Sequence, residues 1–255
     1  MVTNVLAICL VCVTVLLALR FRRFVLRSQA KVWDWRQEVQ LMLLDPRPEV
    51  RNAVVQEVVN YNDWIPVRQF LEGTSSTAIL LRVCETIIDR AEEEYDDASL
   101  LAESLIQVLN ESADSRERRR AAALLRGLPP KHLSSALDQL TTLISLSGDA
   151  TVRLDLLWAL RRGAWSEPHL LERAAAIFID AISDNDDQVA QLAETLLATI
   201  PDEYLYEAEL TICCHLYRHS PTRLDALTRV VESRPLHFRL AASAIEYRKS
   251  TGKVT

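Results

Sequence analysis

Glycine and proline are scarce in this chain, with 5 and 9 among 255 residues. Because both residues interrupt regular structure, their low number favours long helices over many short strands. The five cysteines, at positions 9, 12, 84, 213 and 214, are odd in number and scattered along the chain. This pattern excludes a disulfide-stapled scaffold.

A strong excess of basic charge is also missing. The 29 basic and 35 acidic residues leave a net charge of −6, which argues against a nucleic-acid-binding protein, because the binding domains of such proteins are basic. Hydrophobic residues make up 49% of the chain and charged residues 25%, as in an ordinary globular protein. Strand-like alternation and Asn-Gly or Asp-Gly hairpin turns do not occur. We therefore predict an all-α protein.

The N-terminal region, residues 1–27, begins with an apolar run, since residues 2–19 contain no charged side chain. At 1.5 Å per residue the run is roughly 27 Å long, enough to cross a hydrocarbon core of about 30 Å when flanking side chains reach the interface. A signal peptide carries its positive charge before the run, and a buried core helix is not apolar on every face. We predict one transmembrane anchor followed by membrane-interface residues: Arg20, Phe21, Arg22, Arg23, Phe24 and Arg27.

The arginines after the run determine the expected orientation. Basic residues stay on the cytoplasmic side of a membrane helix, so we expect the N-terminus outside and the body in the cytoplasm, where cysteines stay reduced. Only four of the basic residues are lysines, and this arginine bias, common with GC-rich coding, favours a bacterial inner membrane over an organellar one. The body, residues 28–255, has 25 basic and 35 acidic residues, so an anionic membrane surface repels it.

Helical periodicity continues through the body, in segments separated by short, mostly proline-containing breaks. One pattern recurs in these segments, an arginine or alanine followed by an apolar face. Successive copies lie 31 to 37 residues apart, a spacing that predicts helix pairs in which each second helix opens with the pattern. The equivalent positions are Arg51, Arg82, Arg118, Arg153, Ala190 and Arg223.

These copies resemble HEAT/armadillo-like repeats, in which an aspartate of the turn precedes a Val-Arg pair. Asp45 with Val50 and Arg51 matches this pattern, and Val152 with Arg153 matches its second part. Tetratricopeptide repeats have a similar period, but they need a glycine in the first helix that this chain does not supply.

The resemblance implies a right-handed α-solenoid of about six helix pairs, preceded by the transmembrane helix. We assign residues 28–248 to this repeat domain. Residues 249–255 have almost no apolar surface, and we predict that they form a disordered tail.

Candidate chemical sites are few. His215 and His219 lie four residues apart beside Cys213 and Cys214, a helical spacing that can hold a metal. Because a Cys-x-x-Cys pair is missing, we interpret these residues as packing and surface residues. Phosphate-binding loops, nucleophile elbows and zinc-protease motifs do not occur. We predict no catalytic residue, cofactor or metal, and so no enzyme.

The resulting hypothesis is a membrane-tethered scaffold for a protein partner that is acidic or itself a membrane protein. A membrane receptor for soluble cargo and, less favoured, an enzyme with a HEAT-like body are the alternatives. Equivalent positions of successive second helices form a stripe, and we predict that the stripe binds the partner. Among its arginines, Arg119, Arg126 and Arg162 are those with the least expected structural role. The full stripe is Arg82, Arg90, Arg116, Arg118, Arg119, Arg120, Arg126, Arg153, Arg161 and Arg162.

Overall fold

The computed structural model describes residues 31–32, 34–91, 98–167, 169–217, 224–234 and 236–250. The chain divides into two compact units, Met1–Gly73 and Thr74–Thr255, where the sequence predicted one repeat domain. Over the described residues the regular elements are all helices, without a strand. The predicted all-α class is therefore confirmed.

The first unit is described from residue 31 onward. Trp35 contacts the edge of the Tyr61 ring, with the ring centroids 5.3 Å apart, and Arg36 forms an ion pair with Asp63 at 2.8 Å. These contacts join the unit's first helix to the end of α2. The chain leaves α2 through Asn62, whose φ of 48° is the left-handed conformation that often ends a helix. The helices are 34–43, α2 (Pro48–Tyr61) and α3 (Ile65–Gly73).

The second unit is a succession of helices with short connections. Two 3-10 turns, η1 (Ser134–Ala136) and η2 (Asp202–Tyr204), lie among them. The α-helices are α4 (Thr77–Ala91), α5 (Ala98–Glu111), α6 (Ser115–Gly127), α7 (Pro130–Leu133), α8 (Leu137–Leu146), α9 (Ala150–Trp165), α10 (His169–Ile182), α11 (Asp187–Ala198), α12 (Tyr206–Tyr217), α13 (Leu224–Ser233) and α14 (Arg239–Ser250).

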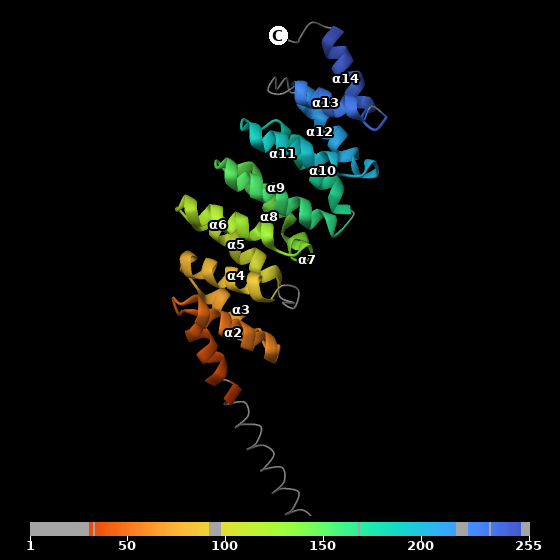
Figure 1. The fold of residues 1–255 in the computed structure, drawn as a ribbon. Helices are drawn as coiled ribbons and strands as arrows, with labels where there is room; N and C mark the ends of the chain where they lie inside the picture. Colours follow the sequence, from red (N-terminus) through yellow and green to blue (C-terminus); the bar gives the residue numbers. More distant parts are fainter. Residues whose placement is uncertain are drawn as a thin grey trace, which may run out of the picture. The chain divides into compact units, whose positions relative to one another are not determined.

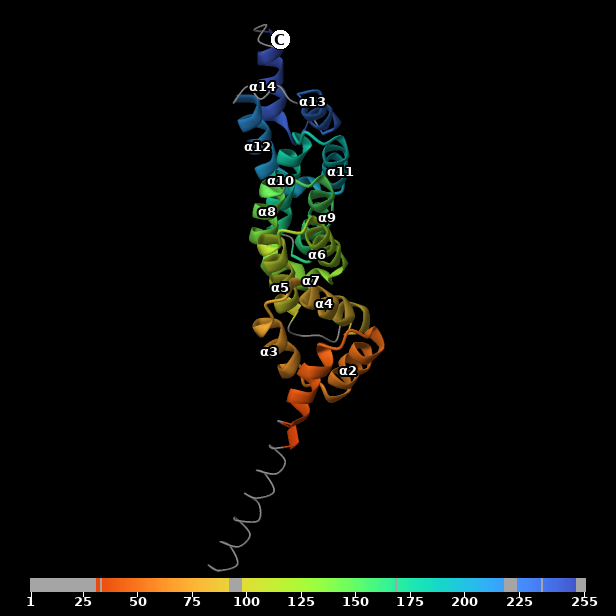
Figure 2. The ribbon, with the colours of Figure 1, turned by 90° about the vertical axis from the view of Figure 1, so that its left-hand side faces the viewer.

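The helices of the second unit alternate between two layers (Figures 1 and 2). One layer contains α4, α6, α9, α11 and α13, and the other contains α5, α7, α8, α10, α12 and α14. Within the first layer, α6 packs against α4 and α9, and α9 packs against α11. Consecutive helices pair across the layers, as α5 does with α6, α8 with α9 and α10 with α11. Each helix thus buries its apolar side on its neighbours.

Aliphatic and aromatic side chains fill the space between these layers. Phe178 of α10 and Phe238, just before α14, are fully buried. α9 passes close to α7 at Gly163, where an added Cβ would lie 2.8 Å from the Cβ of Leu133. At the C-terminal end, the buried carboxylate of Glu209 in α12 accepts from the backbone amide of Leu240 at 2.7 Å, which caps the start of α14.

Parts of the predicted organisation fall outside this description. The predicted anchor, residues 1–27, lies outside the described residues, as do its interface residues. Among the helices that are described, none has both the length and the apolar character needed to cross a membrane. α14 extends to Ser250, so residues 249 and 250, expected in the tail, are helical. Residues 251–255 are not described. The predicted membrane-interface residues that lie outside the described part of the chain are Arg20, Phe21, Arg22, Arg23, Phe24 and Arg27.

Candidate functional site

Three helices begin with the same arginine contact. Arg51 in α2, Arg118 in α6 and Arg153 in α9 are each the fourth residue of their helix. Each donates from Nη1 to the backbone carbonyl oxygen six positions earlier, at 2.6, 2.7 and 2.8 Å respectively. The guanidinium therefore satisfies a carbonyl of the preceding turn and fastens that turn to the helix start.

Arg82 does not belong to this set, which corrects its predicted equivalence. α4 begins at Thr77, so its fourth residue is Leu80, whose side chain is buried. Arg82 is the sixth residue and is exposed. Arg90 lies in the same helix, but its side chain is outside the description, as is all of Arg223.

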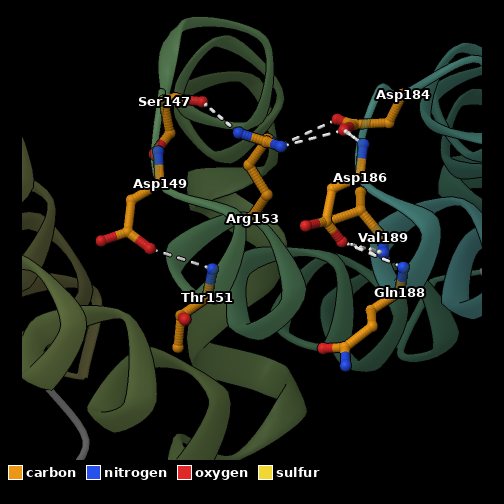
Figure 3. Close-up of polar contacts among 8 residues, drawn as sticks. All are labelled: Ser147, Asp149, Thr151, Arg153, Asp184, Asp186, Gln188 and Val189. Carbon is orange, nitrogen blue, oxygen red and sulfur yellow. Dashed lines mark hydrogen bonds and ion pairs between the residues drawn. The ribbon is translucent and has the colours of Figure 1, made fainter.

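Arg153 also connects α9 to the next turn of the unit (Figure 3). Its Nη2 donates to Asp184 Oδ1 at 2.9 Å, and its Nε lies 2.8 Å from Asp184 Oδ2. Asp184 accepts from the backbone amide of Asp186 at 2.8 Å, and the Asp186 carboxylate caps α11 by accepting from the amides of Gln188 and Val189. Arg153 thereby links two consecutive turns, and its side chain is only 13% exposed.

Two arginines of α6 form ion pairs with α9. Arg119 Nε lies 2.7 Å from Asp149 Oδ2, and Arg126 Nη1 lies 3.1 Å from Asp155 Oδ1. Arg162 donates from Nη1 to the backbone carbonyl oxygen of Arg126. The prediction that Arg119, Arg126 and Arg162 have little structural role is therefore wrong, because all three join α6 to α9. Their partners could not be identified before the helix register was known.

The predicted stripe separates into paired and unpaired arginines. Arg120 pairs with Glu85 of α4, so that four arginines of the stripe, Arg119, Arg120, Arg126 and Arg153, have a carboxylate partner. Arg118, Arg161 and Arg162 bond only to neutral oxygens, those of the Ser112 carbonyl, the Thr199 hydroxyl and the Arg126 carbonyl, so their charge is not compensated by these bonds. Within the described part of the chain, the stripe arginines without a carboxylate partner are Arg82, Arg116, Arg118, Arg161 and Arg162.

Two tryptophans of α9 lie beside arginines: Trp165 beside Arg161, which has no carboxylate partner in the described residues, and Trp158 beside Arg126, which pairs with Asp155. The Arg161 guanidinium carbon lies 3.7 Å from the Trp165 ring centroid, and that of Arg126 lies 5.8 Å from the Trp158 centroid; both distances are within the range of cation–π contacts. Trp158 is 37% exposed and Trp165 is 45% exposed. The sequence analysis missed both, although their seven-residue spacing places them together on one helix face.

We name the group formed by Arg126, Trp158, Arg161, Arg162 and Trp165 the α9 patch. Its surroundings are strongly positive, because α6 carries five arginines against one glutamate and α9 three against one aspartate. These helices contribute net charges of +4 and +2 to a chain whose total is −6. Partial burial lowers the pKa of the Arg161 guanidinium, which indicates that its charge is partly removed from water.

An open groove of about 820 Å³ lies at the other end of α9 from the patch, between the turn that precedes α6 and the turn that precedes α9. Leu109, Leu143 and Leu146 give it an apolar lining. Its charged residues are Arg118, Arg119 and Asp149; Arg119 and Asp149 bond to each other, and Arg118 bonds to the carbonyl oxygen of Ser112. The groove therefore combines an apolar lining with charged groups that already have partners.

The cysteine and histidine candidates are placed on α12, apart from His219, which is not described. His215 Nε2 lies 2.7 Å from Asp180 Oδ1 of α10. Cys214 is exposed and Cys213 half-buried, and burial raises the pKa of the Cys213 thiol. Over the described residues, no group of three His, Cys, Asp or Glu side chains is arranged to hold a metal.

The chain matches no protein family and no curated protein. A crystal structure of an engineered protein from the Northeast Structural Genomics Consortium is similar over 82% of this chain and 97% of that chain, with 14% sequence identity and a TM-score of 0.47. Similarity at that level establishes neither a shared family nor a shared function.

Proposed function

We propose that this protein is a membrane-tethered scaffold that presents a HEAT-like solenoid at the cytoplasmic face of a membrane. The observation that carries this proposal is the α9 patch, in which two exposed tryptophans lie on the same helix as Arg161 and Arg162, which have no carboxylate partner among the described residues. Arginine and tryptophan are enriched among the residues that dominate protein interfaces. Such a patch in an otherwise acidic chain is suited to docking a negatively charged protein.

Two features support the solenoid part of the proposal. Helices of the second unit alternate between two layers, which is the packing of stacked helix pairs. The contact of Arg118 with the carbonyl oxygen of Ser112 recurs in Arg153 and Ser147, 35 residues later. A repeated contact at a repeated spacing is expected when each pair is a copy of one structural unit.

The membrane part rests on the sequence of residues 1–27, with its apolar run and the arginines that follow. Protease protection tests it. A protease added to intact cells is expected to leave a C-terminally tagged protein whole, and to digest it after the membrane is opened. Digestion in intact cells would reverse the orientation, and recovery of the protein in the soluble fraction would contradict the anchor.

The docking part is tested by purifying the full-length protein in detergent after cross-linking in cells. We expect one partner to be recovered repeatedly and to dissociate as salt is raised, because salt screens exposed charge pairs. Arg161→Glu suits this test, since Arg161 belongs to the α9 patch and has no carboxylate partner among the described residues, and we expect it to lose the partner. Recovery of no partner at low salt would contradict the scaffold function.

A further inference from the structure

We infer that the α9 patch binds an acidic amphipathic helix of its protein partner, with two apolar side chains seven residues apart and carboxylates midway between them. This inference rests on the proposed scaffold function and names the partner's chemistry. Three properties of the patch lead to it: the spacing of its tryptophans, the unpaired charge between them and the carboxylate at its edge.

The tryptophan spacing matches that of a helix. Trp158 and Trp165 are seven residues apart on α9, which corresponds to about 10.5 Å along the axis. Apolar side chains at positions i and i+7 of a helix running beside α9 have the same separation. Both indole rings are exposed on a helix whose other large apolar side chains are buried or half-buried. Two apolar side chains of a partner helix therefore have a ring each to pack against.

The positive charges of Arg161 and Arg162, which lie between Trp158 and Trp165 in the sequence, indicate which side chains the partner helix carries between its two apolar residues. Arg162 follows Trp158 by four residues and Arg161 precedes Trp165 by four, so both residues leave the helix on the side of the rings. Arg161 stacks on Trp165 at 3.7 Å and donates from Nε to Thr199 Oγ1 at 3.0 Å, and Arg162 donates from Nη1 to the carbonyl oxygen of Arg126. Both acceptors are neutral, and neither arginine has a carboxylate partner in the described residues, so each keeps an uncompensated charge and further N–H donors. A charge partly removed from water gains more from an opposite charge than a fully solvated one does. Carboxylates at positions i+3 and i+4 of the partner helix supply it.

The carboxylate at the edge of the patch favours a protein over a nucleic acid or an anionic membrane. Asp155 lies three residues before Trp158 on α9 and pairs with the patch residue Arg126 at 3.1 Å. A continuous row of phosphates would be repelled by this acid, whereas two carboxylates on a partner helix can be spaced to reach Arg161 and Arg162 alone.

A peptide titration on the full-length protein in detergent tests the inference. The probe is a helical peptide of alanine and glutamine with two leucines seven residues apart and two glutamates midway between them. We expect saturable binding, weakened about tenfold or more by Arg161→Gln with Arg162→Gln, since two charge-assisted contacts are lost. Trp158→Ser with Trp165→Ser is expected to weaken it to a similar extent. Helicity by circular dichroism checks that both variants are folded.

Arg229→Gln is the matched control, because Arg229 is exposed on α13, pairs with Glu194 and lies outside the patch. It should bind the probe like the unchanged protein. A second peptide with lysines for the glutamates should not bind. The inference is overturned by absence of binding to the acidic peptide, by equal binding of the lysine peptide, or by binding that the patch variants leave intact. It is also overturned if the patch variants instead abolish binding of single-stranded RNA or of anionic lipid vesicles.

The cross-linked partner separates this inference from the function on which it rests. If a partner is recovered with the unchanged protein and equally with the Arg161 and Arg162 variant, the scaffold function stands and the patch is not the contact. If no partner is recovered at all while the peptide binds, the patch binds acidic helices but the scaffold function fails.

Discussion

α6 and α10 are helices of similar length in the same unit that are held by different interactions. α6 has 13 residues with three buried, namely Ala121, Ala122 and Leu125, and pairs with α4 and α9 through arginines at its sides. α10 has 14 residues, of which eight are buried. Burial of apolar area is the dominant stabilising contribution, whereas exposed ion pairs add little. Substitutions on the arginine-rich face of α6 should therefore cost less stability than substitutions in the core side of α10.

Phe178→Ala is expected to have the largest effect on stability. Phe178 of α10 is fully buried, and its truncation loses apolar burial and leaves a cavity, at a cost of about 3–5 kcal/mol. Urea unfolding of the full-length protein in detergent, followed by circular dichroism, measures the change. Leu146→Ala, at a side chain that is 75% exposed, is the control and should change the free energy of unfolding by less than about 0.5 kcal/mol. An equal loss in both would contradict the assignment of α10 to the core.

Arg153→Met is expected to cost about 2–3 kcal/mol, because it leaves the half-buried Asp184 carboxylate and the Ser147 carbonyl without their partner. Arg118→Met removes only a bond to the Ser112 carbonyl, so we expect about 1 kcal/mol there. The same unfolding experiment compares the two. A larger loss at Arg118 than at Arg153 would show that the bond to Asp184 adds no stability.

Gly163→Ala should destabilise by about 1–3 kcal/mol, as overpacking of a close helix contact does. The new Cβ would lie 2.8 Å from Leu133 Cβ and 3.1 Å from its carbonyl carbon, so α9 or the Leu133 backbone would have to shift. Gly127→Ala in α6 is the matched change: its Cβ would meet only Ile88 Cγ2, at 4.0 Å, and alanine is the better helix former. Gly127→Ala should be neutral or stabilising, and a Gly163→Ala protein as stable as the unchanged one would refute the close approach.

Asp149→Asn tests the contribution of an ion pair of α6, since Asp149 pairs with Arg119, and we expect a small effect that depends on pH. Desolvation raises the pKa of Asp149, but hydrogen bonds from Arg119 and the Thr151 amide outweigh it, so the pKa is lowered in the folded state. A lowered folded pKa gives stability that is present above the unfolded pKa of about 3.9 and lost as pH falls through the folded value. The difference between the two proteins, roughly 0.5 kcal/mol at pH 7, should vanish once the pH falls below the folded pKa of Asp149. A difference that persists in acid would contradict the charge-based account.

Local patterns in the sequence predicted much of this arrangement. Arg51, Arg118 and Arg153 each bond to the carbonyl oxygen six residues earlier. Because the two partners are close in the sequence, a short motif is enough to find these arginines. Arg82 was misplaced because the motif was matched by its arginine alone, whereas α4 begins late enough to place Leu80 at the fourth position. Helix starts depend on the preceding loop, which a motif does not contain.

The composition of the candidate site was harder to predict. Arg126 and Asp155 are 29 residues apart, and Arg162 bonds to a carbonyl 36 residues earlier; such partners follow from the register between helices. Trp158 and Trp165 carried a usable signal, because both fall off the apolar positions at Val152, Leu156 and Leu160. That signal was missed because tryptophan is normally assigned to the core.

The most direct test of the central claim measures partner binding and stability in one variant, Arg162→Gln combined with Trp165→Ala. Arg162 contributes one bond to a backbone carbonyl oxygen of α6 and Trp165 is 45% exposed, so the cross-linked partner should be lost while the free energy of unfolding falls by no more than about 1 kcal/mol. Retention of the partner together with a loss of about 3 kcal/mol or more would show instead that these side chains belong to the packing of α9.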